Sequence, residues 1–294
     1  MSIILVFLLA HGASAQKSSS TKPSTTPKSS TSAAVKSGTA AAKSSSSTAK
    51  SSSSTAKSSS KTSSSKSTQY AKSRSGKTYA IPDNPNVVAV KNPDLPYHYL
   101  LYTPEGYKKD STKRYPMILF LHGRSLSGRN VEMVKRYGII YEILRGQKMD
   151  FVVVAPQCQA GWNSDNLIKV LDYAQKNYRV DPCRTYLTGM SMGGYGAWIL
   201  AGDYPNRFAA VAPVCGGGNI KHAKSLRDMP TWVFHGAQDK AVPISESQKM
   251  VNAIKAEKGK KIQFTVYKND GHSELVKVFR MQELYDWFLK HELP

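Results

Sequence analysis

Three features are scarce or missing in this chain of 294 residues. It has only three cysteines, Cys158, Cys183 and Cys215, an odd number with no metal-ligand spacing. The apolar run at residues 3–10 is too short to cross a bilayer, which requires about 20 residues. Residues 16–79 contain no acidic side chain. The few cysteines argue against a cysteine-based metal site, and the short apolar run argues against stable insertion in a membrane.

Residues 1–15 have the pattern of a secretory signal peptide. The run "IILVFLLA" is followed by Ala13-Ser14-Ala15, a small-x-small cleavage pattern, just before Gln16. No basic residue precedes the run, although most signal peptides have one there. We therefore expect the protein to be exported, and so secreted or periplasmic.

Residues 16–79 consist almost entirely of Ser, Thr, Ala, Lys and Pro, and "AKSSSST" occurs twice in succession. Such a segment has too little apolar surface to offset the entropy of ordering it, so we predict that it is disordered. It carries twelve Lys or Arg, so residues 80–294 keep only +9 of the formal net charge of +21. Because the basic residues are spread singly, a solvated spacer is favoured over a tail that contacts cell wall or other polyanions. No specific nucleic-acid partner is expected.

Residues 80–294 alternate between short apolar runs and segments with helical spacing. The runs expected to form strands are 97–104, 116–123, 151–156, 185–189, 209–217, 231–236 and 262–269. The segments expected to form helices are 130–145, 164–178, 192–203, 245–258 and 274–291. Strand alternating with helix predicts a single α/β domain with a mostly parallel central sheet and helices on both faces.

The stretch Gly189-Met190-Ser191-Met192-Gly193 fits the pattern G-x-S-x-G between an expected strand and an expected helix. At a sharp strand-to-helix turn, only very small residues fit two positions before and after the serine. The helix start also directs backbone N–H groups toward an oxyanion beside the serine. The pattern favours Ser191 as a nucleophile, and the alternative is an ordinary turn between a strand and a helix.

A serine nucleophile needs a base, and the base needs an orienting carboxylate. Asp239 follows the expected strand 231–236, and His272 follows the last one, in the chain order Ser, Asp, His. His235, Asp270 and His291 are the rivals, and we interpret each as structural because a triad needs separate loops that converge. The predicted catalytic residues are therefore Ser191, Asp239 and His272.

The oxyanion hole needs a second backbone donor from the loop after strand 116–123. We assign its donors to the backbone N–H groups of Arg124 and Met192. The side chain of Arg124 could guard the site or attract an acidic substrate. His122 is interpreted as a turn histidine that supports the loop.

Taken together, "FLHGRSLSG", "YLTGMSMGGYGAW", "FAAVAPVCGGG", "TWVFHGAQDKAVP" and "VYKNDGHSELV" resemble the α/β-hydrolase superfamily. The resemblance is to its secreted esterase and predicted-peptidase branch, near dienelactone hydrolases, phospholipase/carboxylesterases and feruloyl or acetyl-xylan esterases. It implies the same triad and oxyanion hole. It also implies a strand order that keeps the three cysteines too far apart for a disulfide. Only about ten residues lie between Gly218 and Met229, so we expect no large lid domain.

These features predict a serine carboxylesterase that needs neither a metal nor an organic cofactor. An open site suits a small-molecule or polymer-linked ester, and we expect an ester of a carbohydrate or phenolic compound. Trp162 is a candidate aromatic wall for the substrate, and the alternative is that it packs beneath its own loop. A serine peptidase of the same fold and a non-catalytic binding relative remain the alternative functions.

Overall fold

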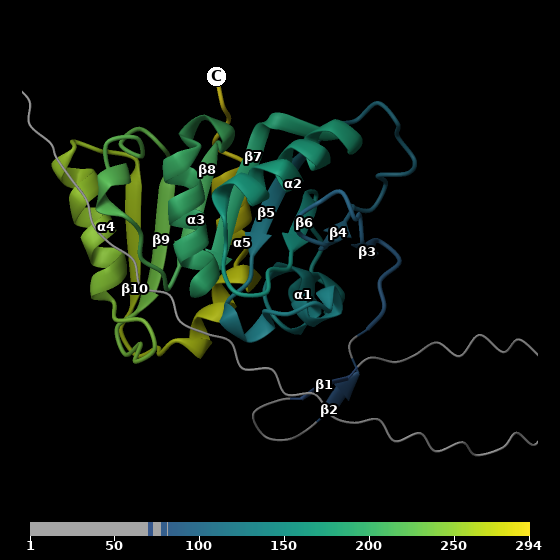
Figure 1. Ribbon diagram of the computed structural model, residues 1–294, viewed down its shortest axis with the longest axis horizontal. Coiled ribbons are helices and arrows are strands. Elements are labelled where there is room, and N and C mark those ends of the chain that lie inside the picture. The colour runs from purple at the N-terminus through teal and green to yellow at the C-terminus, as the bar shows by residue number, and fades with distance from the viewer. Residues whose placement is uncertain (1–69, 73–77, 81) are drawn as a thin grey trace, which may run out of the picture. The chain divides into compact units, whose positions relative to one another are not determined.

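The computed structural model describes residues 70–72, 78–80 and 82–294 (Figure 1). The predicted signal peptide and most of the predicted disordered segment lie outside the described residues. Strand β1 (Tyr70–Lys72) lies within the range of that segment and β2 (Thr78–Ala80) crosses its end, and the two pair antiparallel with Tyr70 opposite Ala80. Regular structure therefore begins before residue 80, where the composition indicates that the folded domain starts.

An eight-stranded sheet forms the centre of the domain, in the order β10-β9-β8-β7-β5-β6-β4-β3 (Figure 1). Six neighbouring strands are parallel: β5 (Tyr115–Leu121), β6 (Val152–Pro156), β7 (Val180–Met190), β8 (Ala210–Val214), β9 (Thr231–Gly236) and β10 (Ile262–Tyr267). Two strands at one edge are antiparallel: β3 (Val87–Val90) and β4 (Tyr99–Tyr102). The prediction of a mostly parallel α/β sheet is confirmed, and β3 is a strand that the sequence reasoning did not include.

The apolar runs form strands because both of their faces are buried. Every residue of β5, β6 and β8 is buried, as expected for strands in the middle of a sheet covered on both sides. The side chains of β5 divide between two cores: Ile118 and Phe120 belong to one, and Met117 and Leu119 to the other. This alternation is the period of two that a strand imposes.

Helices from both faces of the sheet complete these two cores. One core contains the buried faces of α1 (Ile139–Leu144) and α5 (Gln282–Phe288) with the 3-10 helices η2 (Val131–Arg136) and η5 (Ser273–Arg280). The other contains α2 (Ser164–Asn177), α3 (Met192–Asp203) and α4 (Ser245–Ala256). The remaining 3-10 helices are η1 (Arg124–Leu126), η3 (Pro205–Arg207) and η4 (Ile220–His222).

Two predicted helices are wrong in part, because each is interrupted. Residues 130–145 form η2 and then α1, since Gly138 has a φ of +85° and a side chain there would collide with the ring of Phe120. Residues 274–291 form η5 and then α5, separated by Met281 in an extended conformation. The other three helices, α2, α3 and α4, match their predicted ranges to within two residues.

The carboxyl ends of the six parallel strands meet at one edge of the sheet, which we call the carboxyl edge. Because β4 runs antiparallel to β6, the segment that precedes β4 also lies at this edge. Between β8 and β9 the chain forms only η4 and turns, which agrees with the absence of a large lid domain in the described part of the chain. None of the described helices is long and apolar enough to cross a membrane.

The three cysteines are unpaired. Strands β7 and β5 separate β6, which precedes Cys158, from β8, which precedes Cys215, as the resemblance implied. Cys183 lies in the first half of β7, away from the carboxyl edge.

Candidate active site

Ser191 stands at the junction of β7 and α3, where the chain turns sharply. Its φ of 59° and ψ of −119° make it one of three described non-glycine residues with positive φ. Such a conformation costs about 1–3 kcal/mol and persists only where the surroundings enforce it. Here the backbone N–H of Ser191 donates to Val214 O at 2.9 Å, which ties the turn to the end of β8.

The glycines around Ser191 allow this turn because any side chain in their place would meet backbone. A Cβ at Gly189 would overlap Gly193 O, and a Cβ at Gly193 would overlap Leu121 O at the end of β5. A Cβ at Gly194 would lie 2.5 Å from Val214 O. The first two glycines therefore let the turn close, and the third lets α3 approach β8.

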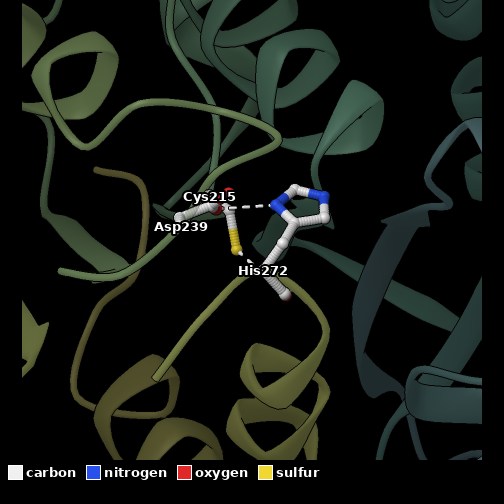
Figure 2. Close-up of side chains that lie close together, drawn as sticks. All are labelled: Cys215, Asp239 and His272. Atoms are coloured by element: carbon white, nitrogen blue, oxygen red, sulfur yellow. Dashed lines mark hydrogen bonds and ion pairs between the residues drawn. The ribbon is translucent and has the colours of Figure 1, made fainter. Parts of the chain in front are cut away.

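Asp239 and His272 form a short hydrogen bond in which Nδ1 of His272 donates to Oδ2 of Asp239 at 2.6 Å (Figure 2). The carboxylate is fully buried, and its Oδ1 accepts from the backbone N–H groups of Ala241 and Val242 at 2.9 and 2.8 Å. Figure 2 shows the other ring nitrogen of His272 facing away from Asp239. The carboxylate thus fixes the tautomer that leaves Nε2 of His272 free to accept a proton.

The structure brings the three predicted catalytic residues to the carboxyl edge. Ser191 follows β7, Asp239 follows β9, and His272 follows β10. Two of them contact the end of β8: the N–H of Ser191 donates to Val214 O, and the Sγ of Cys215, which follows β8, lies 3.9 Å from His272 O. All three residues therefore lie in separate loops at the same edge of the sheet.

The segment 122–124 passes directly beside the turn at Ser191. A Cβ built on Gly123 would lie 3.3 Å from Cβ of Ser191, and the N–H of Gly123 donates to Tyr137 Oη at 2.9 Å. Arg124 begins η1 and Met192 begins α3, and the N–H of a first helical residue has no acceptor within its own helix. Both predicted oxyanion donors therefore belong to backbone positions suited to bind an anion. Tyr137 is a supporting residue that the sequence did not reveal.

His122 supports this loop, as the sequence predicted. Its ring is buried, its Nδ1 lies 2.8 Å from Gly123 O, and its Nε2 accepts from the N–H of Cys158 at 3.2 Å. Burial lowers the pKa of His122 to about 4. The ring is therefore neutral near pH 7 and holds the loop after β5 against the loop after β6.

Cys215 lies beside the pair formed by Asp239 and His272 (Figure 2). Its Sγ, a carboxylate oxygen and a ring nitrogen lie within 4.8 Å of one another, a spacing that a metal ion could bridge. However, Nδ1 of His272 carries the proton shared with Asp239, and burial raises the pKa of the Cys215 thiol well above its ordinary value. Since metal ligands must be deprotonated, this donor set fits a proton-transfer pair better than a metal centre.

His235, which we interpreted as structural, also contacts the carboxylate. Its Nε2 lies 3.0 Å from Val242 O and 3.4 Å from Oδ2 of Asp239, and its Nδ1 lies 2.7 Å from Oγ of Ser247. Both partners of Nε2 are acceptors, so this nitrogen carries a proton. For this contact the only signal in the sequence is the spacing of four residues between His235 and Asp239.

Trp162 is partly exposed, and its indole is held on several sides. Its Nε1 donates to His122 O at 3.1 Å, and its ring meets the ring of Tyr97 edge-on at a centroid distance of 5.6 Å. A Cβ at Gly196 of α3 would lie 2.7 Å from the indole. These contacts support the alternative in which Trp162 packs beneath its loop.

The chain is similar to several known proteins. The family model described as "Putative esterase" matches residues 91–277, more than half of the chain. A bifunctional acetylxylan esterase/xylanase of Neocallimastix patriciarum is 30% identical over 149 residues, which are 47% of this chain and 21% of that protein. "Probable feruloyl esterase C" of Aspergillus terreus is 28% identical over 162 residues, 52% of this chain and 59% of that protein.

The chain therefore spans less than two thirds of the length of these curated relatives. Among solved structures, a thermostable esterase superposes with a TM-score of 0.61 at 26% identity. That superposition covers 76% of this chain and 70% of the other.

Proposed function

Because the chain belongs to the esterase family whose model covers residues 91–277, we propose that it is a serine carboxylesterase that acts through an acyl-enzyme. The observation that carries the proposal is the hydrogen bond from His272 to Asp239 at the same sheet edge as the strained Ser191. In this proposal Ser191 is the nucleophile, His272 the general base and acid, and Asp239 the carboxylate that orients the imidazole.

The first half of the reaction forms the acyl-enzyme. Nε2 of His272 takes the proton of Ser191 Oγ as that oxygen attacks the ester carbonyl. The N–H groups of Arg124 and Met192 stabilise the oxyanion of the tetrahedral intermediate. The intermediate then collapses, the carbon–oxygen bond to the alcohol breaks, and His272 gives its proton to the departing alcohol.

The second half releases the acid. His272 takes a proton from a water molecule, which attacks the acyl carbonyl and forms a second tetrahedral intermediate. Its collapse breaks the bond to Ser191 Oγ, and His272 returns the proton to that oxygen. Atoms and charges balance without a metal or an organic cofactor.

We further propose that the substrate is an ester of a carbohydrate or phenolic compound, either free or attached to a polymer. Relatives described as acetylxylan and feruloyl esterases support this class. The short connection between β8 and β9, which holds only η4, leaves the site open to a bulky substrate. The predicted signal peptide is consistent with work outside the cell, on polymers.

The test is covalent labelling of the protein with a fluorophosphonate, followed by identification of the labelled residue. We expect stoichiometric labelling of Ser191, none in Ser191→Ala, and full labelling in the control Ser225→Ala, whose hydroxyl bonds Gly202 O and His222 O instead. Labelling at another residue, or no labelling of the native chain, would contradict the proposal and favour a non-catalytic relative.

Ester and amide substrates then separate esterase from peptidase. We expect p-nitrophenyl acetate to be hydrolysed with a higher kcat/KM than a peptide p-nitroanilide. A clear preference for the anilide would favour the peptidase.

A further inference from the structure

A pocket of about 410 Å³ lies at the carboxyl edge, next to the loop that carries Arg124. It is lined by residues 95–98, Gly128, Arg129, Gln157 and residues 159–161, and we call it the loop pocket. The three segments come from the approach to β4, the loop after η1 and the loop after β6. Only the antiparallel direction of β4 brings the first segment to this edge.

The loop pocket is joined directly to the loop that carries Arg124. Nε2 of Gln157 donates to Leu126 O at 2.8 Å, and the N–H of Gly128 donates to Cys158 O at 3.0 Å. A substrate held in the pocket is therefore held by the same loop that supplies a proposed oxyanion donor. That placement suits a part of the substrate remote from the ester bond.

One wall of the loop pocket is an aromatic ring in a fixed position. Tyr97 is half-buried, its ring meets Trp162 edge-on, and its hydroxyl accepts from the N–H of Asn163 at 3.2 Å. An amphipathic ring held on two sides loses little freedom when it binds a ligand. Tyr97 is thus positioned to serve as an aromatic wall, and Trp162, which the sequence suggested for that role, packs against it.

The polar groups of the loop pocket are basic or neutral. Its lining includes Arg129, His98, Gln157 and Gln159 and no acidic residue. Nε of Arg129 donates to Oε1 of Gln159 at 3.0 Å, which orients the guanidinium. Among the described residues no carboxylate pairs with Arg129. An oriented guanidinium without a counter-charge is suited to bind a carboxylate, in the bidentate manner that lysine cannot reproduce.

We propose that the loop pocket binds an acidic sugar unit, a uronate, of the polymer that carries the ester. The inference rests on the proposed function and names the substrate class of that site. The carboxylate of the sugar pairs with Arg129, its ring lies against Tyr97, and its hydroxyls meet the amides of Gln157 and Gln159. The volume of the loop pocket is near the lower end of the range for ligand pockets, about 300–1,000 Å³. The side chains of His98 and Gln159 are exposed, so the rest of the polysaccharide can leave the pocket on their side.

The test measures binding without turnover, using the Ser191→Ala protein and calorimetry. The probes are two pairs that differ in charge: trigalacturonate with its methyl ester, and glucuronate-substituted xylotriose with xylotriose. We expect at least one acidic probe to bind tenfold or more tightly than its neutral partner, with an affinity that falls as salt rises. Equal affinity within both pairs, or no binding of any probe, would overturn the proposal.

Variants then locate the binding site. Arg129→Gln should weaken the acidic probe about tenfold, and Arg129→Lys should restore only part of that loss. The matched control is Arg145→Gln. Arg145 is an exposed arginine directly after α1, it does not line the loop pocket, and it bonds Tyr141 Oη. An equal loss in Arg145→Gln would show that general charge, and not the loop pocket, attracts the probe.

Rates of hydrolysis distinguish a failure of this inference from a failure of the proposed function. These measurements use protein that keeps Ser191. We expect Arg129→Gln to lower kcat/KM for an acidic polymer ester more than it lowers kcat/KM for p-nitrophenyl acetate, so the ratio of the two values should fall. If the native chain hydrolyses neither ester, the proposed function fails while the binding measurement still stands. If it hydrolyses both and the ratio is unchanged in Arg129→Gln, the loop pocket does not bind the substrate.

Discussion

Nε2 of His235 lies 3.4 Å from Oδ2 of Asp239, and both side chains are fully buried. The same oxygen accepts the hydrogen bond from His272 at 2.6 Å. The carboxylate is therefore held between two imidazoles, that of His272, which we propose as the general base, and that of the fully buried His235. His235 is a positioning residue in this arrangement, because it acts on Asp239 and not on the substrate.

Replacing this second imidazole should lower kcat. In His235→Leu the carboxylate loses a polar neighbour worth about 1 kcal/mol, so we expect kcat per active site to fall about fivefold with little change in KM. His235→Gln, which can still donate to Val242 O, should recover part of the loss. The concentration of active sites is measured by fluorophosphonate labelling, so unfolded protein does not lower the kcat that is calculated.

The control for this prediction is His222→Gln. That residue has the same 3.4 Å distance to a carboxylate, Asp203, but at the end of α3 remote from the carboxyl edge. It should leave kcat unchanged. A wild-type kcat per titrated site in His235→Leu would show that His235 only fills the core.

Gly193→Ala should be severely destabilising. The added Cβ would overlap Leu121 O, which belongs to the central strand β5 and cannot move aside. We expect the free energy of unfolding to fall by about 3 kcal/mol or more, measured by urea denaturation. Gly146→Ala is the matched control, because its φ is +101° but its Cβ would meet nothing within 4 Å. Gly146→Ala should lower the free energy of unfolding by only about 1 kcal/mol, because alanine is strained at a positive φ. An equal decrease in the two variants would disprove the steric explanation.

Ser191→Gly should be more stable than Ser191→Ala, although we expect neither variant to be active. Alanine keeps the unfavourable φ of 59°, whereas glycine adopts it readily. This difference exceeds the entropy that glycine adds to the unfolded chain, so we expect about 1 kcal/mol in favour of glycine. Thermal unfolding of the two proteins gives the comparison. An alanine variant as stable as the glycine variant would mean that the turn is not strained.

Acid should destabilise the protein through His122. Its ordinary pKa is 6.5, and burial lowers it to about 4 in the folded state. Below pH 6.5 the unfolded chain therefore binds a proton that the folded chain refuses, and stability is lost as pH falls toward 4. The loss from this one group is at most about 1.4 kcal/mol per pH unit within that window.

Two measurements check this prediction. The ring proton resonance of His122 should titrate with a midpoint near 4, and the pH dependence of unfolding should be shallower in His122→Gln. A His122 midpoint near 6.5 would show that the ring is not held neutral by the fold. Burial also lowers the pKa of His235, which adds to the loss in the same direction.

The sequence predicted the fold well where a residue pattern repeats locally. Continuous apolar runs identified the six parallel strands, and G-x-S-x-G located the turn at Ser191. The interruption at Gly138 was missed because the helical spacing of residues 130–145 continues through it. Only the ring of Phe120, eighteen residues earlier in the chain, explains why a glycine with positive φ is needed there.

The parts of the site that could not be predicted depend on contacts between distant segments. The direction of β4 is not encoded in its own residues, so the position of Tyr97 at the carboxyl edge could not be derived. For the same reason the sequence left two roles open for Trp162, and only the fold shows that its ring lies against Tyr97 and α3. Tyr137 lacks any motif, and no pattern in the sequence places Cys215 next to His272; the fold alone brings these residues to Gly123 and His272.

The reversed direction of β4 has a consequence for how such an enzyme can diversify. Residues 95–98 and 159–161 line the loop pocket, but neither segment contains Ser191, Asp239 or His272. A library randomised at these positions would vary what the protein recognises while leaving the proposed chemical machinery intact. New substrate preferences could then arise by exchange of two short surface segments, without rebuilding the nucleophile turn.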